Sequence, residues 1–81
     1  MLTKKQIKFI IGQKLKKLIK EKFSQIEVAD KINVSKTTIC NMCAGRGNFQ
    51  IDKYLDVIAF LKVDSNEVFY ITQEDIDRYL N

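Results

Sequence analysis

Two short helical segments separated by a sharp break constrain the fold of this chain more than any other feature. Ser24 stands three residues before Glu27, which is the spacing of a capping box at a helix N-terminus. Asn33, a residue that tolerates the left-handed conformation, then ends the first segment. Ser35 can cap a second helix directly afterwards. The sequence therefore predicts two helices joined by a turn of three or four residues, over residues 25–32 and 36–44.

Apolar residues occupy fixed places within this stretch. Counted from Gln25 as the first position, the small Ala29 is fifth, and Val34, Ile39 and Met42 are tenth, fifteenth and eighteenth. A small fifth residue lets the two helices cross closely, while the three larger side chains hold the second helix on the core. The other face of the second helix is polar. This pattern is typical of a helix-turn-helix unit.

A long first helix is predicted before this unit. Thr3 and Gln6 have capping-box spacing, and the helix should continue to about Glu21. Apolar residues recur in it at intervals of three and four and predict one buried stripe, composed of Ile7, Ile10, Ile11, Leu15, Leu18 and Ile19. Gly12 costs about 1 kcal/mol relative to alanine inside a helix. Either a neighbouring helix approaches closely at Gly12 or the glycine is merely tolerated.

Another helix is predicted over residues 50–61, after a turn at residues 45–48. Its predicted buried residues are Ile51, Leu55 and Ile58, with Tyr54 and Leu61 as further candidates. The apolar run at residues 68–71 has strand propensity but also fits a helical turn that closes the core. Thr72 and Asp75 have the spacing of a last helix cap.

The organisation that follows is one all-α domain over residues 1–81. Helix-forming segments fill most of the chain, and 81 residues are too few to divide into several domains. The expected architecture is a compact bundle of five helices with a short C-terminal extension at about residues 70–81. The apolar residues near that extension are Phe69, Tyr70, Ile71, Ile76, Tyr79 and Leu80. They can either form a dimer contact or pack under the first helix.

Basic residues are concentrated in the first half of the chain. Residues 1–46 hold eleven Lys and Arg against three Asp and Glu, a net charge of +8, whereas residues 47–81 hold three against seven, a net charge of −4. A basic surface attracts a polyanion. A lysine-rich helix face can also simply be solvated, so charge favours a nucleic-acid partner without establishing one.

The composition argues against several classes of protein. The chain has no histidine, which is the commonest general base and a common metal ligand, and its three glycines cannot build a phosphate-binding loop. We therefore expect no enzyme, no metal, no cofactor and no small-molecule ligand. No apolar run reaches the roughly 18 residues that a membrane span needs, and no signal peptide is visible. A cytoplasmic protein with reduced thiols is expected.

Cys40 and Cys43 form a C-x-x-C sequence, the spacing of redox dithiols and of half a zinc site. A zinc site needs four ligands, and no histidine or further cysteine is present to complete one. A reactive thiol is favoured at a helix N-terminus, whereas this pair lies in the middle to C-terminal part of its predicted helix. We interpret the spacing as incidental, with Cys43 in the core and Cys40 at the flank of the polar face.

From residue 11 to about residue 69 the chain resembles the Cro/C1-type (XRE) helix-turn-helix family of phage and bacterial repressors. The resemblance is carried by the segments IGQKLKKLI, SQIEVADKINVSKTTICNM, AGRGN, IDKYLDVIAFLKVD and NEVF. Three features depart from the family pattern. Asn33 replaces a common turn glycine, the loop before Ser24 is one residue short, and Cys43 replaces a common acidic residue. Several members pair that acid with a buried arginine at the position matching Ile19, so two apolar residues are expected to pack together here.

The resemblance implies a lambda-repressor-like DNA-binding domain that regulates transcription, as a repressor. The third helix would enter the major groove of a palindromic double-stranded DNA operator, and the protein would bind as a homodimer. The runner-up is a protein-binding helix-turn-helix module such as an antitoxin or an anti-repressor. A protein-binding third helix would expose apolar anchors, whereas this one offers Lys36, Thr37 and Asn41.

Roles for individual residues follow from the same resemblance. The expected DNA-contacting residues are Gln25, Ser35, Lys36, Thr37, Thr38, Cys40, Asn41, Arg46 and Asn48. Gln25 would bind a phosphate, where free amides and the helix dipole attract an anion. Lys36 and Thr37 would meet base edges or flanking phosphates, and Asn41 could make the bidentate contact that selects adenine. The lysines of the first helix, Lys14 above all, are expected to add non-specific attraction to the phosphates, without any single one being a site residue.

Five of these assignments have a competing structural interpretation. Gln25 can be an ordinary solvent-exposed helix start. Ser35 can serve only as a helix cap, and Thr38 can bond within its own helix. Arg46 and Asn48 can belong to a plain surface turn, or they can clamp the DNA backbone together with loop amides.

Overall fold

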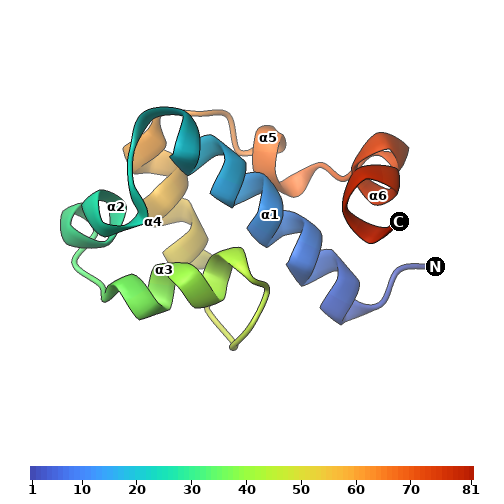
Figure 1. Cartoon of the computed structure of the whole chain (residues 1–81), viewed down its shortest axis with the longest axis horizontal. Helices are drawn as coiled ribbons and strands as arrows, with labels where there is room; N and C mark the ends of the chain where they lie inside the picture. The colour runs from blue at the N-terminus through green and yellow to red at the C-terminus, as the bar shows by residue number, and fades with distance from the viewer.

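The computed structural model describes all 81 residues, and helices are its only regular elements (Figure 1). They are α1 (Lys4–Lys22), α2 (Gln25–Lys31), α3 (Lys36–Cys43), α4 (Ile51–Leu61), α5 (Asn66–Phe69) and α6 (Gln73–Leu80). The all-α class is confirmed, and the apolar run at residues 68–71 forms no strand: its first two residues end the short helix α5 and its last two have no regular structure. None of the helices combines the length and apolar character needed to cross a membrane.

Three helices begin at the capping boxes predicted from the sequence. Thr3, Ser24 and Thr72 each accept a hydrogen bond from the backbone N–H three residues on, and the side chain of that third residue accepts one from the backbone N–H of the cap. These bonds satisfy backbone donors that have no partner inside the helix. The start positions of α1, α2 and α6 are thus set by local sequence.

The turn between α2 and α3 is closed by the left-handed residue that the sequence indicated. Asn33 has a φ angle of 60°. Its N–H donates to the carbonyl of Asp30, and the N–H of Val34 donates to the carbonyl of Ala29 at 2.9 Å. This pair of bonds is a Schellman motif, which satisfies the last carbonyls of α2 and reverses the chain. The orientation of α3 relative to α2 is therefore fixed by backbone hydrogen bonds.

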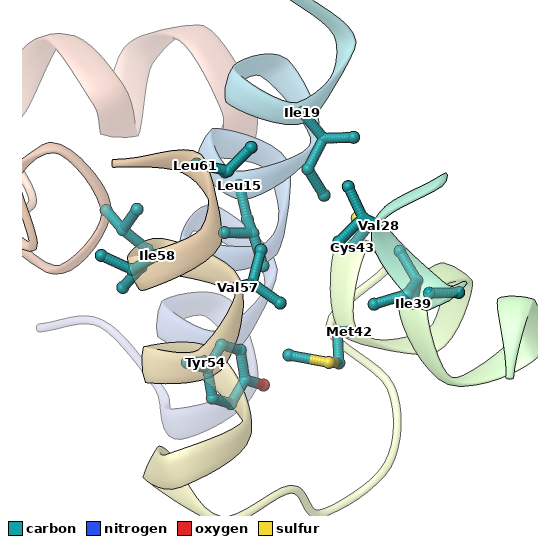
Figure 2. Close-up of a cluster of buried hydrophobic side chains, with 12 residues drawn as sticks. Leu15, Ile19, Val28, Ile39, Met42, Cys43, Tyr54, Val57, Ile58 and Leu61 are labelled. Carbon is teal, nitrogen blue, oxygen red and sulfur yellow. The ribbon is translucent and has the colours of Figure 1, made fainter. Parts of the chain in front are cut away.

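The core lies where α1, α2, α3 and α4 meet (Figure 2). Its buried members are Leu15, Ile19, Val28, Ala29, Ile39, Met42, Cys43, Tyr54, Val57, Ile58, Leu61 and Val68. Cys43 is 3% exposed and belongs to the same apolar cluster as Ile19. Aromatic side chains extend the cluster: Phe23 packs on Phe60 with ring centroids 4.8 Å apart. The prediction that Ile39, Met42 and Cys43 hold α3 on the core is confirmed.

Two predicted core positions on α4 are wrong. Ile51 is 59% exposed and Leu55 is 43% exposed, whereas Tyr54 and Ile58 are buried together with Val57, which the sequence pattern did not single out. The cause is the rotation of α4 about its axis, which turns the Tyr54 side inward. There the Tyr54 ring packs edge-on against Phe69, with centroids 6.4 Å apart.

The buried stripe on α1 is narrower than predicted. Ile10, Leu15 and Ile19 are buried, and Ile11 and Leu18 are partly buried. Ile7 is 36% exposed and lies outside the buried stripe.

The C-terminal extension forms the helix α6, which lies against α1 (Figure 1). Its apolar side chains Ile76, Tyr79 and Leu80 are half-buried. The Lys14 ammonium lies 2.7 Å from the Asp75 carboxylate and also donates to the carbonyl of Tyr70. The hydrogen bond from Lys14, more than any other cause, holds the pKa of Asp75 below its ordinary value. Packing and this ion pair hold the extension on its own chain.

Candidate nucleic-acid interface

The helix α3 is anchored on one side and polar on the other. Ile39 and Met42 are fully buried, and they point into the core with Cys43 (Figure 2). On the other side, Lys36 and Thr37 are exposed and Asn41 is half-buried. The side chains of Lys36, Thr37 and Asn41 make no hydrogen bond or ion pair within the chain. The structure thus brings the three expected base-reading residues to one outward face.

The N-terminal end of α3 is built by two hydroxyl groups. Ser35 Oγ accepts a hydrogen bond from the backbone N–H of Thr38 at 3.1 Å, and the two side-chain hydroxyls lie 3.0 Å apart. The capping interpretation of Ser35 and the intrahelical interpretation of Thr38 therefore describe their contacts in this structure. A hydroxyl group has one donor and two acceptor sites, so this pairing leaves capacity for a further hydrogen bond.

Gln25 and Cys40 are joined across α2 and α3. The Cys40 thiol donates a hydrogen bond to Gln25 Oε1 at 3.0 Å. This contact leaves the Nε2 amide of Gln25, which has two N–H donors, free beside the N-terminus of α2. Sequence reasoning placed both residues at the interface but did not anticipate that one holds the other. Cys40 thus orients the side chain of Gln25 through this hydrogen bond.

The loop after α3 is fixed by glycine and by α1. Gly45 has a φ angle of 73°, its N–H donates to the carbonyl of Met42, and the N–H of Arg46 donates to the carbonyl of Asn41. This second Schellman motif ends α3 and leaves the Arg46 side chain exposed. The Lys8 ammonium donates to the carbonyl of Gly47 and to Asn48 Oδ1. Asn48 is therefore exposed but tied to α1.

The C-terminal end of α3 lies directly on the backbone of α1. A Cβ atom on Gly12 would lie 2.4 Å from the carbonyl oxygen of Met42 and 2.6 Å from that of Cys43. The neighbouring Gln13 donates from Nε2 to the carbonyl of Cys43 at 3.1 Å. The close-approach interpretation of Gly12 is confirmed, and the position of α3 depends on it.

A shallow basic hollow lies between α1, α2 and α3. It has two parts, of about 140 Å³ and about 230 Å³, and Lys16 and Gln25 line both of them. Arg46 and Cys40 line the part nearest α3. The fold thus brings Lys16 beside Gln25, Cys40 and Arg46, although no motif in the sequence singled it out. The one sequence signal for Lys16 was its position on α1 away from the buried stripe.

Lys14 does not line this basic hollow. Its ammonium is paired with Asp75 and its side chain is only 13% exposed. Lys14 is thus not a free cation in this structure, and its contribution to phosphate attraction stays a prediction. Lys16, two residues on, is exposed and lines the hollow.

The two cysteines have different environments. Burial raises the pKa of the Cys43 thiol to about 11, and the neighbouring Cys40 adds to the rise while Lys16 opposes it. A thiol with this pKa is protonated at neutral pH and is a poor nucleophile. Both cysteines are free, and no three Cys, Asp or Glu side chains gather as metal ligands.

Comparison of the chain with models of protein families, with characterised proteins and with solved structures finds no match. The polar face of α3, the Gln25 amide and the basic hollow are therefore described from this chain alone. The hollow brings Gln25, Cys40 and Arg46 together with Lys16 of α1.

Proposed function

We propose that this chain is a sequence-specific, double-stranded DNA-binding transcriptional regulator of the Cro/C1 type, acting as a repressor in the cytoplasm. In this proposal α1 to α5 form a lambda-repressor-like domain, α2 and α3 form its helix-turn-helix unit, and α6 is an added C-terminal helix. The observation that carries the proposal is the outward face of α3, where Lys36, Thr37 and Asn41 have no partner within the chain.

Each part of the surface has a defined task in this proposal. The N-terminal half of α3 enters the major groove, where Thr37 and Asn41 contact base edges. The Gln25 amide and the N-terminus of α2 bind a phosphate on one side, and Arg46 with the loop amides binds the backbone on the other. Lys16 adds charge between them. Phosphate contacts on both sides set the depth and register of α3.

The composition of the α3 surface favours DNA over a protein partner. Protein interfaces are anchored by buried aromatic and aliphatic side chains, but Ile39 and Met42, the large apolar residues of α3, are fully buried in the core. The outward positions carry the ammonium of Lys36, the hydroxyl of Thr37 and the amide of the half-buried Asn41. These groups match the donors and acceptors that base edges present in the major groove.

Footprinting on the DNA upstream of the chain's own gene tests the proposal, together with affinity measured across salt concentrations. A protected inverted repeat is expected, with affinity falling steeply as salt rises because bound phosphates release counterions. Thr37→Ala and Asn41→Ala should each reduce discrimination between bases by about 1–3 kcal/mol. The matched control is Asn81→Ala at the end of the chain. Full discrimination in both α3 variants would contradict the assignment.

A further inference from the structure

A second surface, separate from the α3 face, is apolar and uncovered. A groove of about 520 Å³ lies between α1, the residues before α4, and α5. Its apolar lining comprises Ile11, Phe49, Ile51, Tyr54 and Phe69, and Lys4 and Lys8 of α1 also line it. Ile51 therefore belongs both to this groove and to the exposed side of α4. We call it the α1–α4 groove. No residue of α6 lines it, and α4 and α6 lie on different sides of α1 (Figure 1).

An exposed apolar stripe runs along α4 from the mouth of this groove. Ile51, Leu55 and Ala59 follow one another at intervals of four residues, and all three are exposed. This spacing forms a ridge of the kind that packs into the groove of another helix. Asp52 and Asp56, one residue further on, flank the ridge with negative charge and are also exposed. We call these five residues the α4 stripe.

We propose that the α1–α4 groove and the α4 stripe form the contact between two copies of this chain, related by a two-fold axis. An isologous interface needs a surface that is complementary to itself. One face of this chain carries both parts: a groove with an apolar lining and the exposed Lys4 on its wall, and an apolar ridge edged by aspartates. In the dimer, Ile51 and Leu55 of each copy leave water against the other copy, and Asp52 faces the partner's Lys4.

The opposite charges explain why a second copy fits better than an arbitrary apolar peptide. Charge complementarity sets the register of an interface and rejects other partners. If the α4 stripe of one copy slid along that of the other, away from the two-fold arrangement, the aspartates of the two copies would face each other. The two-fold arrangement instead pairs each aspartate edge with a lysine edge, and it does so twice.

The position of this contact also suits the proposed function, on which this step rests. The segment that precedes α4 begins at the end of α3, so a contact at the start of α4 leaves the N-terminal half of α3 free for DNA.

Sedimentation equilibrium of the full chain without DNA tests the interface directly. The wild type is expected to dimerise, and Leu55→Glu should raise the dimer dissociation constant at least tenfold, because a charge would enter the apolar contact. Lys53→Glu is the matched control, since Lys53 is exposed on the same helix but about 200° from Ile51, and it should leave the constant unchanged. Circular dichroism establishes that each variant is folded.

A charge exchange removes any dependence on a single variant. Lys4→Glu alone and Asp52→Lys alone should each weaken the homodimer, because each places like charges together at both contacts. An equimolar mixture of the two variants should associate more tightly than either alone, because both contacts in the mixed dimer are then attractive. Continued dimerisation of Leu55→Glu, a mixture no tighter than its components, or a wild type monomeric at millimolar concentration would overturn the proposal.

The outcomes separate this proposal from the proposed function. If the dimer behaves as expected but binds no specific DNA, the interface stands and the DNA-binding proposal fails. If the wild type protects an inverted repeat while Leu55→Glu still dimerises, the regulator stands and the interface fails. Loss of affinity for a full repeat with unchanged affinity for an isolated half-site is the result that supports both.

Discussion

The substitution Gly12→Ala probes the contact that positions α3. It adds one methyl group to α1 where the C-terminal backbone of α3 passes. The new Cβ atom would lie 2.4 Å from the carbonyl oxygen of Met42, whereas ordinary van der Waals contact begins at 3.4 Å. The obstacle is backbone, which cannot rotate aside as a side chain can. The two helices must therefore separate by about 1.0 Å, the difference between those two distances.

Two costs and one gain decide the magnitude. Overpacking of this kind costs about 1–3 kcal/mol, and the hydrogen bond from Gln13 to the carbonyl of Cys43, worth about 0.5–1.5 kcal/mol, would weaken as the helices separate. Alanine regains about 1 kcal/mol over glycine in helix propensity. The expected result is a net loss of about 1–3 kcal/mol. A domain of this size is stable by only about 4–12 kcal/mol, so the loss is substantial.

Thermal and urea unfolding followed by circular dichroism measure this loss. A loss of about 2 kcal/mol should lower Tm by roughly 8–16 °C. Lys17→Ala, at an exposed position of the same helix, is the control and should change stability by no more than about 0.5 kcal/mol. A variant that gains about 1 kcal/mol, the value of helix propensity alone, would refute the close approach of α1 and α3.

Three further predictions address the turn, the cysteine and the C-terminal helix. Asn33→Gly should change stability by only a few tenths of a kcal/mol, whereas Asn33→Val should cost about 1–2 kcal/mol in thermal unfolding, because φ is 60° there; equal stabilities would contradict the role of the left-handed turn. Cys40→Ala should weaken DNA binding about fivefold, or ~1 kcal/mol, by releasing Gln25, and Cys40→Ser should retain affinity; equal binding by Ala, Ser and wild type in titrations would remove the positioning role. The pKa of Asp75 is lowered chiefly by Lys14, so the ion pair stabilises α6 above about pH 4, the ordinary carboxyl pKa, and this contribution is lost as pH falls through the lowered value. Hydrogen exchange of α6 amides should follow that loss in the wild type, while Asp75→Asn should show fast exchange already at pH 7.

Local signals in the sequence were sufficient to predict most of the helix boundaries. Capping boxes and left-handed turn residues act over three to five residues, so their outcome depends little on the rest of the chain. The starts at Thr3, Ser24 and Thr72 and the break at Asn33 are all observed. The inward and outward faces of α3 were also predicted correctly, because they differ sharply in polarity.

The parts that could not be predicted depend on contacts between distant residues. The hydrogen bond between Cys40 and Gln25 joins positions fifteen apart, and the pair of Lys14 and Asp75 joins positions sixty-one apart. Neither leaves a periodic signal. The sequence identified Cys40 as a flank and Lys14 as a free cation because pattern reasoning treats each helix as though it were alone.

The wrong assignments on α4 have a different origin. Apolar periodicity shows which side chains benefit from leaving water, but it does not show which surface covers them. On α4 the apolar side chains span more than half of the helix circumference, so the core can cover only part of them. It covers Tyr54, Val57, Ile58 and Leu61. Ile51 and Leu55 remain exposed in the single chain, and in the dimer proposed above they leave water between two copies. An apolar side chain predicted to be buried but found exposed is thus itself an indication of an interface. Leu55→Glu distinguishes a contact between copies from a role in the core, because it should spare the fold and disrupt the association.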